Sequence, residues 1–111
     1  MTITRITMIK LLSEDSIPQA LEGYKIFTET QRKDGKPYIL SMEAGPANGH
    51  VRDQGFNFVA KNVFKDKADM EFFEVECEGH EGFRAYLKEK APVVEEGLMV
   101  CWFESGISYA L

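Results

Sequence analysis

At 111 residues the chain has the length of one domain, and we expect a single domain over residues 1–111. Its composition, 44% hydrophobic and 28% charged, is typical of a globular protein, and its net charge of −5 argues against nucleic acid or an anionic membrane surface as a partner. The chain has no apolar run long enough to span a bilayer and no secretory signal, and its two cysteines, Cys77 and Cys101, lie in apolar surroundings. We therefore expect reduced, buried thiols in a cytoplasmic protein.

The first half of the chain predicts a strand, a helix and a second strand. Residues 2–12 are rich in Ile and Thr, as strands are. A helix follows, capped by Ser13 or Ser16, with Pro18 in its first turn and apolar residues at helical spacing: Ile17, Ala20, Leu21, Tyr24 and Phe27. Residues 33–37 end this helix in a turn, and residues 38–43 form the second strand.

The second half predicts a strand, an interrupted helix and a last strand. Residues 55–64 alternate, with Phe56, Phe58, Ala60 and Phe64 on one face. Asp66 opens a helix that extends through Cys77, Gly79 breaks or bends it, and the helical pattern resumes as far as Lys90. Residues 97–104 form the last strand. The order βαββαβ in so short a chain predicts an α+β, ferredoxin-like protomer: a four-stranded antiparallel sheet with helices on one face.

Both faces of the last strand are apolar, since Leu98, Val100 and Trp102 alternate with Met99, Cys101 and Phe103. Helices cover only one face of such a sheet, and at roughly 25 cal/mol per Å² a wet apolar face forfeits many kcal/mol. The sequence therefore predicts a homodimer whose two sheets pack face to face.

The segment ECEGHEGFRAYL, residues 76–87, holds the candidate site residue His80 among glutamates, three positions after Cys77. Helical spacing places His80 with Phe83 and Leu87 on one stripe, so the imidazole points toward the sheet. There it is either a proton carrier in a cavity or a partly buried histidine bonded to a backbone carbonyl or a tyrosine. Cys77 lies three residues earlier, but no second Cys/His pair completes a zinc site, and we predict no metal.

Three pieces of the sequence, ITRITMIKL, DQGFNFVAKNVFKDKADMEFF and CEGHEGF followed by LMVCWFE, resemble the stress-responsive dimeric α+β barrel (Dabb) family over nearly the whole chain. The resemblance implies that the sheets of two protomers close into a barrel. One plant member is a cofactor-free polyketide cyclase whose cavity lies between sheet and helices. His80 matches a histidine of that enzyme and Tyr24 a cavity tyrosine, whereas Arg5 replaces a histidine, and Phe72 and Phe73 stand where a tyrosine is expected.

Two functions remain open at this point. One is a stress-associated dimeric barrel that binds a small hydrophobic or aromatic ligand near His80. The other is a cofactor-independent cyclase-like or monooxygenase-like enzyme in which His80 is the general base. The candidate ligand-binding residues are Tyr24, Arg5, Phe73, Phe83 and Trp102, although aromatic residues of strands and helices also commonly serve as core. No cofactor motif is visible, so any chemistry is expected to be cofactor-free.

Overall fold

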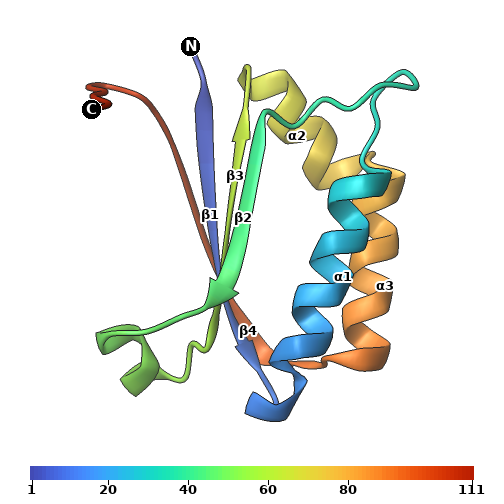
Figure 1. Ribbon diagram of the computed structural model, residues 1–111, viewed down its shortest axis with the longest axis vertical. Helices are drawn as coiled ribbons and strands as arrows, with labels where there is room; N and C mark the ends of the chain where they lie inside the picture. Colours follow the sequence, from blue (N-terminus) through green and yellow to red (C-terminus); the bar gives the residue numbers. More distant parts are fainter.

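The computed structural model describes residues 1–111 and places one antiparallel sheet beside a layer of helices (Figure 1). The strands are β1 (Ile3–Leu11), β2 (Ser41–Pro46), β3 (Phe58–Phe64) and β4 (Val93–Glu104). The helices are α1 (Ile17–Thr30), α2 (Lys67–Val75) and α3 (Glu78–Lys90), with short 3-10 turns η1 (Glu14–Ser16) and η2 (His50–Gln54). The strand order β2-β3-β1-β4 confirms the predicted ferredoxin-like βαββαβ protomer.

The start of β2 and the length of β4 differ from the prediction. The second strand begins at Ser41 and not at Tyr38, because the backbone N–H groups of Tyr38 and Ile39 donate to the Gln31 side chain at 2.9 and 3.2 Å. The last strand is longer than predicted. It pairs with β1 from Val93 onward, across an irregularity between Ile9 and Leu11. Such bulges re-aim the residues on either side of them.

The interruption of the second helical segment lies earlier than Gly79, so the prediction was wrong in its position. Helix α2 ends at Val75, Cys77 is the N-cap of α3, and Gly79 is inside the first turn of α3. A Cβ atom at Gly79 would lie 3.2 Å from the carbonyl oxygen of Thr30. The glycine thus permits the close approach of α3 to the end of α1.

The core lies between the sheet and the helices. Alternation in the strands places Ile3 and Ile9 of β1 and Phe58 and Phe64 of β3 on the helix side, where all four are buried. On α1 the stripe differs in one place from the prediction: Leu21 is 36% exposed, whereas Gly23 is buried. Gly23 is buried because the ring of Tyr86 packs directly against it: a Cβ at Gly23 would lie 2.5 Å from the Cδ1 atom of that ring.

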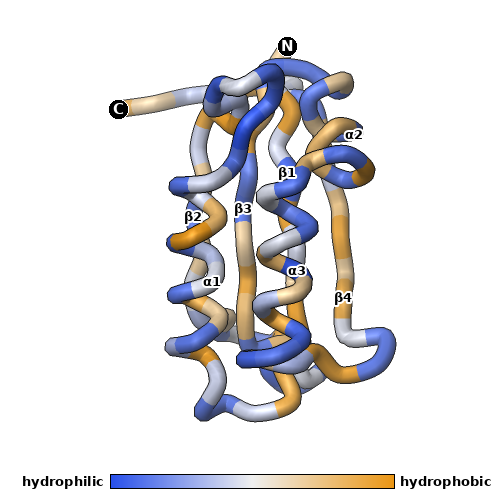
Figure 2. The backbone as a smooth tube through the Cα atoms, turned by 90° about the vertical axis from the view of Figure 1, so that its right-hand side faces the viewer, coloured by the Kyte–Doolittle hydropathy of each residue, from blue (hydrophilic) through white to orange (hydrophobic).

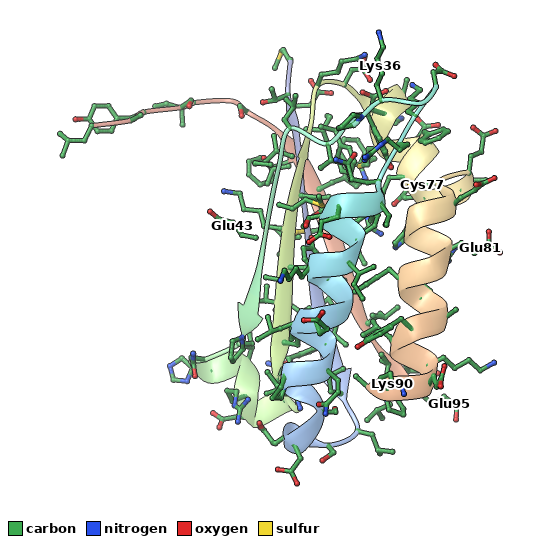
Figure 3. All side chains as sticks on the ribbon, turned by 45° about the vertical axis from the view of Figure 1, so that its right-hand side comes forward. Lys36, Glu43, Cys77, Glu81, Lys90 and Glu95 are labelled. Atoms are coloured by element: carbon green, nitrogen blue, oxygen red, sulfur yellow. The ribbon has the colours of Figure 1, made fainter.

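The opposite face of the sheet, here called the open face, has no helix over it (Figure 1). The β1–β4 register pairs Met8 with Met99 and Ile6 with Cys101, and Val59 of β3 lies beside Met8. Met99 and Phe103 are each about half exposed, and Cys101 is exposed as well, contrary to the buried thiol that we expected. Glu43 of β2 also projects on the side away from the helices (Figure 3). The open face is therefore a mainly apolar surface of the isolated chain, bordered by charge.

The last residues leave the sheet on the side of this open face (Figure 1). Residues 105–111 form no helix or strand, and Ile107, Tyr109 and Leu111 are almost fully exposed. None of the helices combines the length and the apolar composition that a membrane span requires.

Candidate functional site

His80 is fixed by the break between α2 and α3. Because α3 begins after Cys77, the imidazole lies in its first turn and faces the end of α2. Its Nδ1–H donates to the carbonyl oxygen of Phe73 over 2.9 Å. The last carbonyls of a helix have no partner within that helix, so this bond satisfies one of them. His80 is thus bonded to a backbone carbonyl, as one of the two alternatives for this residue required.

Three phenylalanine rings surround the imidazole. Phe73 stacks on it with ring centroids 3.9 Å apart and planes inclined by 21°. Phe27 of α1 lies 5.8 Å away and Phe83, one turn further along α3, 6.4 Å away. The rings and the hydrogen bond together leave the imidazole one orientation.

This environment keeps the imidazole neutral. Burial lowers the pKa of His80 from its ordinary value of 6.5 to about 4, the hydrogen bond to Phe73 opposes this shift, and the charges of Arg84 and Arg5 add to it. With Nδ1 carrying the proton that Phe73 accepts, Nε2 has the free lone pair. Near neutral pH the ring therefore presents a hydrogen-bond acceptor at Nε2.

A cavity of about 450 Å³ adjoins His80. It opens between α3 and the two strands β1 and β4, because β4 runs at the edge of the sheet beyond α3 (Figure 2). Its lining is made by Arg5, Ile9, Glu74, His80, Phe83, Arg84, Leu87, Lys88, Pro92, Val93 and Leu98. Glu96, two residues before Leu98, has a positive φ of 58°, in the irregular part of β4 that borders the cavity.

Arg5 forms the inner polar end of the cavity. Its Nε donates to Glu74 at 3.1 Å, its Nη1 donates to the Thr7 hydroxyl at 2.8 Å, and its guanidinium lies 5.0 Å from the centre of the Phe73 ring. The side chain is only 13% exposed. A cation held by a carboxylate, a hydroxyl and an aromatic face has one defined position beside the imidazole.

The structure brings together some of the six residues singled out from the sequence and separates others. Arg5, His80 and Phe83 line the cavity, and Phe73 lies behind the imidazole without lining it. Tyr24 is buried outside the cavity, where its hydroxyl bonds to Asn62 and burial raises its pKa. Trp102 pairs with Arg5 in the sheet, yet it lies outside the cavity with the ammonium of Lys67 5.6 Å from its ring.

Sequence reasoning missed the charged residues of the cavity other than Arg5. Arg84 and Lys88 follow His80 at intervals of four, so the same helical stripe that placed His80 contained them. Glu74 gave no such signal, because its partner Arg5 is 69 positions away in the chain.

The Cys77–His80 pair does not converge on a common point in space. His80 packs on Phe73, whereas the buried thiol of Cys77 lies by Tyr38, whose pKa is raised by burial and by this neighbour. The structure contains no group of three or more His, Cys, Asp or Glu side chains arranged to hold a metal ion. Figure 3 shows Cys77 at the start of α3 and Glu81 on its outer side.

A curated relative covers most of this chain. No model of a known protein family matches the sequence. The "Fusaristatin A biosynthesis cluster protein" of Gibberella zeae is 33% identical to it over 102 residues, which are 92% of this chain and 72% of that protein.

Solved structures share the fold at low sequence identity. A dimeric ferredoxin-like protein of unknown function from Jannaschia sp. CCS1 has a TM-score of 0.71 at 16% identity, covering 94% of this chain and 99% of that one. The hydroxynitrile lyase of Passiflora edulis has a TM-score of 0.68 at 16% identity over 98% and 97%. SnoaB, a cofactor-independent oxygenase from Streptomyces nogalater, has a TM-score of 0.64 at 11% identity over 96% and 95%. At such identities these likenesses establish the fold.

The neutral state of His80 makes stability depend on pH. The folded pKa of about 4 is below the ordinary 6.5, so the unfolded chain binds the proton more readily, and stability present above pH 6.5 is lost as the pH falls toward 4. When the pH falls from 7 to 5, we expect the titration of His80 to lower the free energy of unfolding by about 2 kcal/mol. Urea unfolding at both pH values measures this loss.

The variant His80→Gln keeps a donor for the Phe73 carbonyl but does not titrate, so its loss between the same pH values should be smaller by this amount. His50→Gln is the control, because it also removes one histidine, but at a fully exposed position. Equal losses in the wild type and in His80→Gln would contradict the neutral, buried imidazole.

Proposed function

This chain belongs to the family of the Fusaristatin A biosynthesis cluster protein of Gibberella zeae, and on that premise we propose that it is a dimeric α+β barrel that binds a small hydrophobic molecule in the cavity beside His80. The name of the relative supports a role near the synthesis of a small molecule. The sequence motifs that resemble the stress-responsive dimeric α+β barrel family support the same assembly. The ligand itself is to be identified by the chemistry of the cavity.

The cavity that touches the imidazole carries the proposal. Its volume of about 450 Å³ lies within the range of roughly 300 to 1,000 Å³ that small-molecule sites occupy. Ile9, Phe83 and Leu87 give it an apolar inner wall, and Val93 and Leu98 extend this wall along β4. A histidine that served packing alone would be surrounded by filled space. Here one ring edge is held by Phe73 while the residue borders the cavity.

The homodimer rests on the open face. Met99 and Phe103 of β4 together with Ile6, Met8 and Val59 would remain in contact with water in an isolated chain, which monomers rarely tolerate over such an area. A second copy related by a two-fold axis presents the same apolar surface to this face. The likeness to dimeric ferredoxin-like proteins supports this packing.

A cofactor-independent enzyme is the second candidate, and one observation favours it. Because the Nδ1–H of His80 is engaged by Phe73, the nitrogen left with a lone pair is Nε2, as a general base requires. In the reaction that we propose, Nε2 takes a proton from a carbon next to a carbonyl of the substrate, and the C–H electron pair moves into an enolate. Arg84, in the same lining and without an ion-pair partner, would stabilise the negative charge on the enolate oxygen. The folds shared with a hydroxynitrile lyase and a cofactor-independent oxygenase are compatible with such chemistry.

Filling the cavity should prevent ligand binding. The neutral fluorescent probe N-phenyl-1-naphthylamine should bind to the wild type, and Leu98→Trp should weaken its binding about tenfold or more, because the indole occupies the mouth of the cavity. Leu40→Trp is the matched control, since Leu40 is similarly exposed and lies outside this cavity. A fluorescence titration with equal affinities for the wild type and Leu98→Trp would contradict the binding site.

Charge on the open face should dissociate the dimer. Light scattering at micromolar concentration should give the wild type a mass near twice 12.6 kDa, and Met99→Asp a mass near 12.6 kDa or an unfolded chain. Val75→Asp adds the same negative charge at an exposed position of α2, and this variant should stay dimeric. A monodisperse wild-type monomer would overturn the proposed assembly.

The enzyme candidate makes its own prediction about His80. His80→Gln keeps a donor for the Phe73 carbonyl but removes the basic nitrogen, so turnover of a linear polyketide-like substrate should fall by about 100-fold or more while probe binding persists. Product formation followed by chromatography measures this. Turnover that survives His80→Gln would exclude the histidine as the base and leave the binding function standing.

A further inference from the structure

We propose that the cavity beside His80 selects an organic anion, an apolar molecule with one acidic group, and that Arg84 and Lys88 of α3 bind that group. The inference rests on the proposed binding function and adds the chemical class of the ligand. It is carried by the charges in the lining, by the partners those charges have or lack, and by the apolar wall opposite them.

The lining is positive although the protein is acidic. Arg5, Arg84 and Lys88 contribute three positive charges and Glu74 one negative charge, so the cavity carries 3 − 1 = +2, while the whole chain carries −5. His80 adds nothing to this sum near neutral pH, because its low pKa keeps it neutral. A local excess of one sign in a protein of the other sign attracts ligands of opposite charge.

Arg84 and Lys88 are the charges that a ligand can use. Both are exposed, and neither forms any of the ion pairs of the chain. They are four residues apart on α3, so their Cβ atoms are about 5–6 Å apart on one face, close enough for both side chains to reach one acidic group. An arginine and a lysine together offer directed donors and a mobile ammonium.

Unlike Arg84 and Lys88, the positive side chain at the inner end of the cavity, Arg5, has an ion-pair partner. Arg5 is paired with Glu74 at 3.1 Å, and this carboxylate repels a second acid there. The acidic group of a ligand is therefore directed toward Arg84 and Lys88 at the outer end. Its apolar body faces the apolar side chains of the lining, Ile9, Phe83, Leu87, Val93 and Leu98.

A pair of probes with one aromatic skeleton separates charge from burial. N-phenyl-1-naphthylamine is neutral, and 8-anilino-1-naphthalenesulfonate carries the same rings with one added anionic group. Fluorescence titrations of the wild type, of Arg84→Gln/Lys88→Gln and of Lys25→Gln/Lys36→Gln give the affinities of both probes. The last variant removes the same charge at two exposed lysines outside the cavity.

We expect the wild type to bind the anionic probe more tightly than the neutral one, and to lose this preference as the salt concentration rises. Arg84→Gln/Lys88→Gln should weaken anion binding about fivefold while leaving the neutral probe unaffected. Lys25→Gln/Lys36→Gln should bind both probes as the wild type does.

Two results would overturn the inference, and they have different meanings. If the neutral probe binds in the cavity but the anionic probe binds no better, or if both double variants weaken the anion equally, the site exists without this selectivity. If neither probe binds, the proposed binding function fails and this inference fails with it.

Discussion

The hydrogen bond between the Nδ1–H of His80 and the carbonyl of Phe73 ties the end of α2 to the start of α3. The helical segment is broken after Val75, so the last carbonyls of α2 need partners and α3 can take a new direction. That bond stacks the imidazole on Phe73 and places Phe83, Arg84, Leu87 and Lys88 along the wall that faces β1 and β4. The contact that joins the two helices is thus also the contact that positions the residues of the candidate site. It also determines which ring nitrogen can accept a proton.

Strand β4 connects assembly with the cavity through the alternation of its side chains. Leu98 faces the cavity, whereas the next residue, Met99, belongs to the open face. Burial of the open face against a second copy would therefore leave the cavity side of the same strand available to a ligand. Dimer assembly and ligand binding both depend on this edge strand. The irregularity near Glu96 and Gly97 sets the register of β4 and therefore affects both.

The sequence contained the fold in its periodicities and the site only in part. Alternation in residues 58–64 and the stripe of His80, Phe83 and Leu87 predicted which sides face the core, because both patterns follow from local backbone geometry. The start of β2 was predicted wrongly, because the Gln31 side chain, just after α1, accepts a hydrogen bond from the backbone N–H of Tyr38. The helix break was predicted too late, at Gly79, whereas α2 ends at Val75 and α3 begins after Cys77. The Arg5–Glu74 pair has no local signal at all. Tyr24 was grouped with the site by the family resemblance and Trp102 by its aromatic side chain. The packing of α1 and the edge position of β4 keep them out of the cavity.

The central claim is that a neutral imidazole with a free Nε2 borders a ligand-binding cavity. The ¹⁵N resonances of the two histidine rings test it most directly, recorded at neutral pH with and without N-phenyl-1-naphthylamine, with exposed His50 as the internal reference. The account predicts a His80 ring protonated at Nδ1 alone, with an Nε2 resonance that shifts on addition of the probe while His50 stays unchanged. A His80 ring protonated at Nε2, or a probe that binds without moving the His80 resonances, would contradict it.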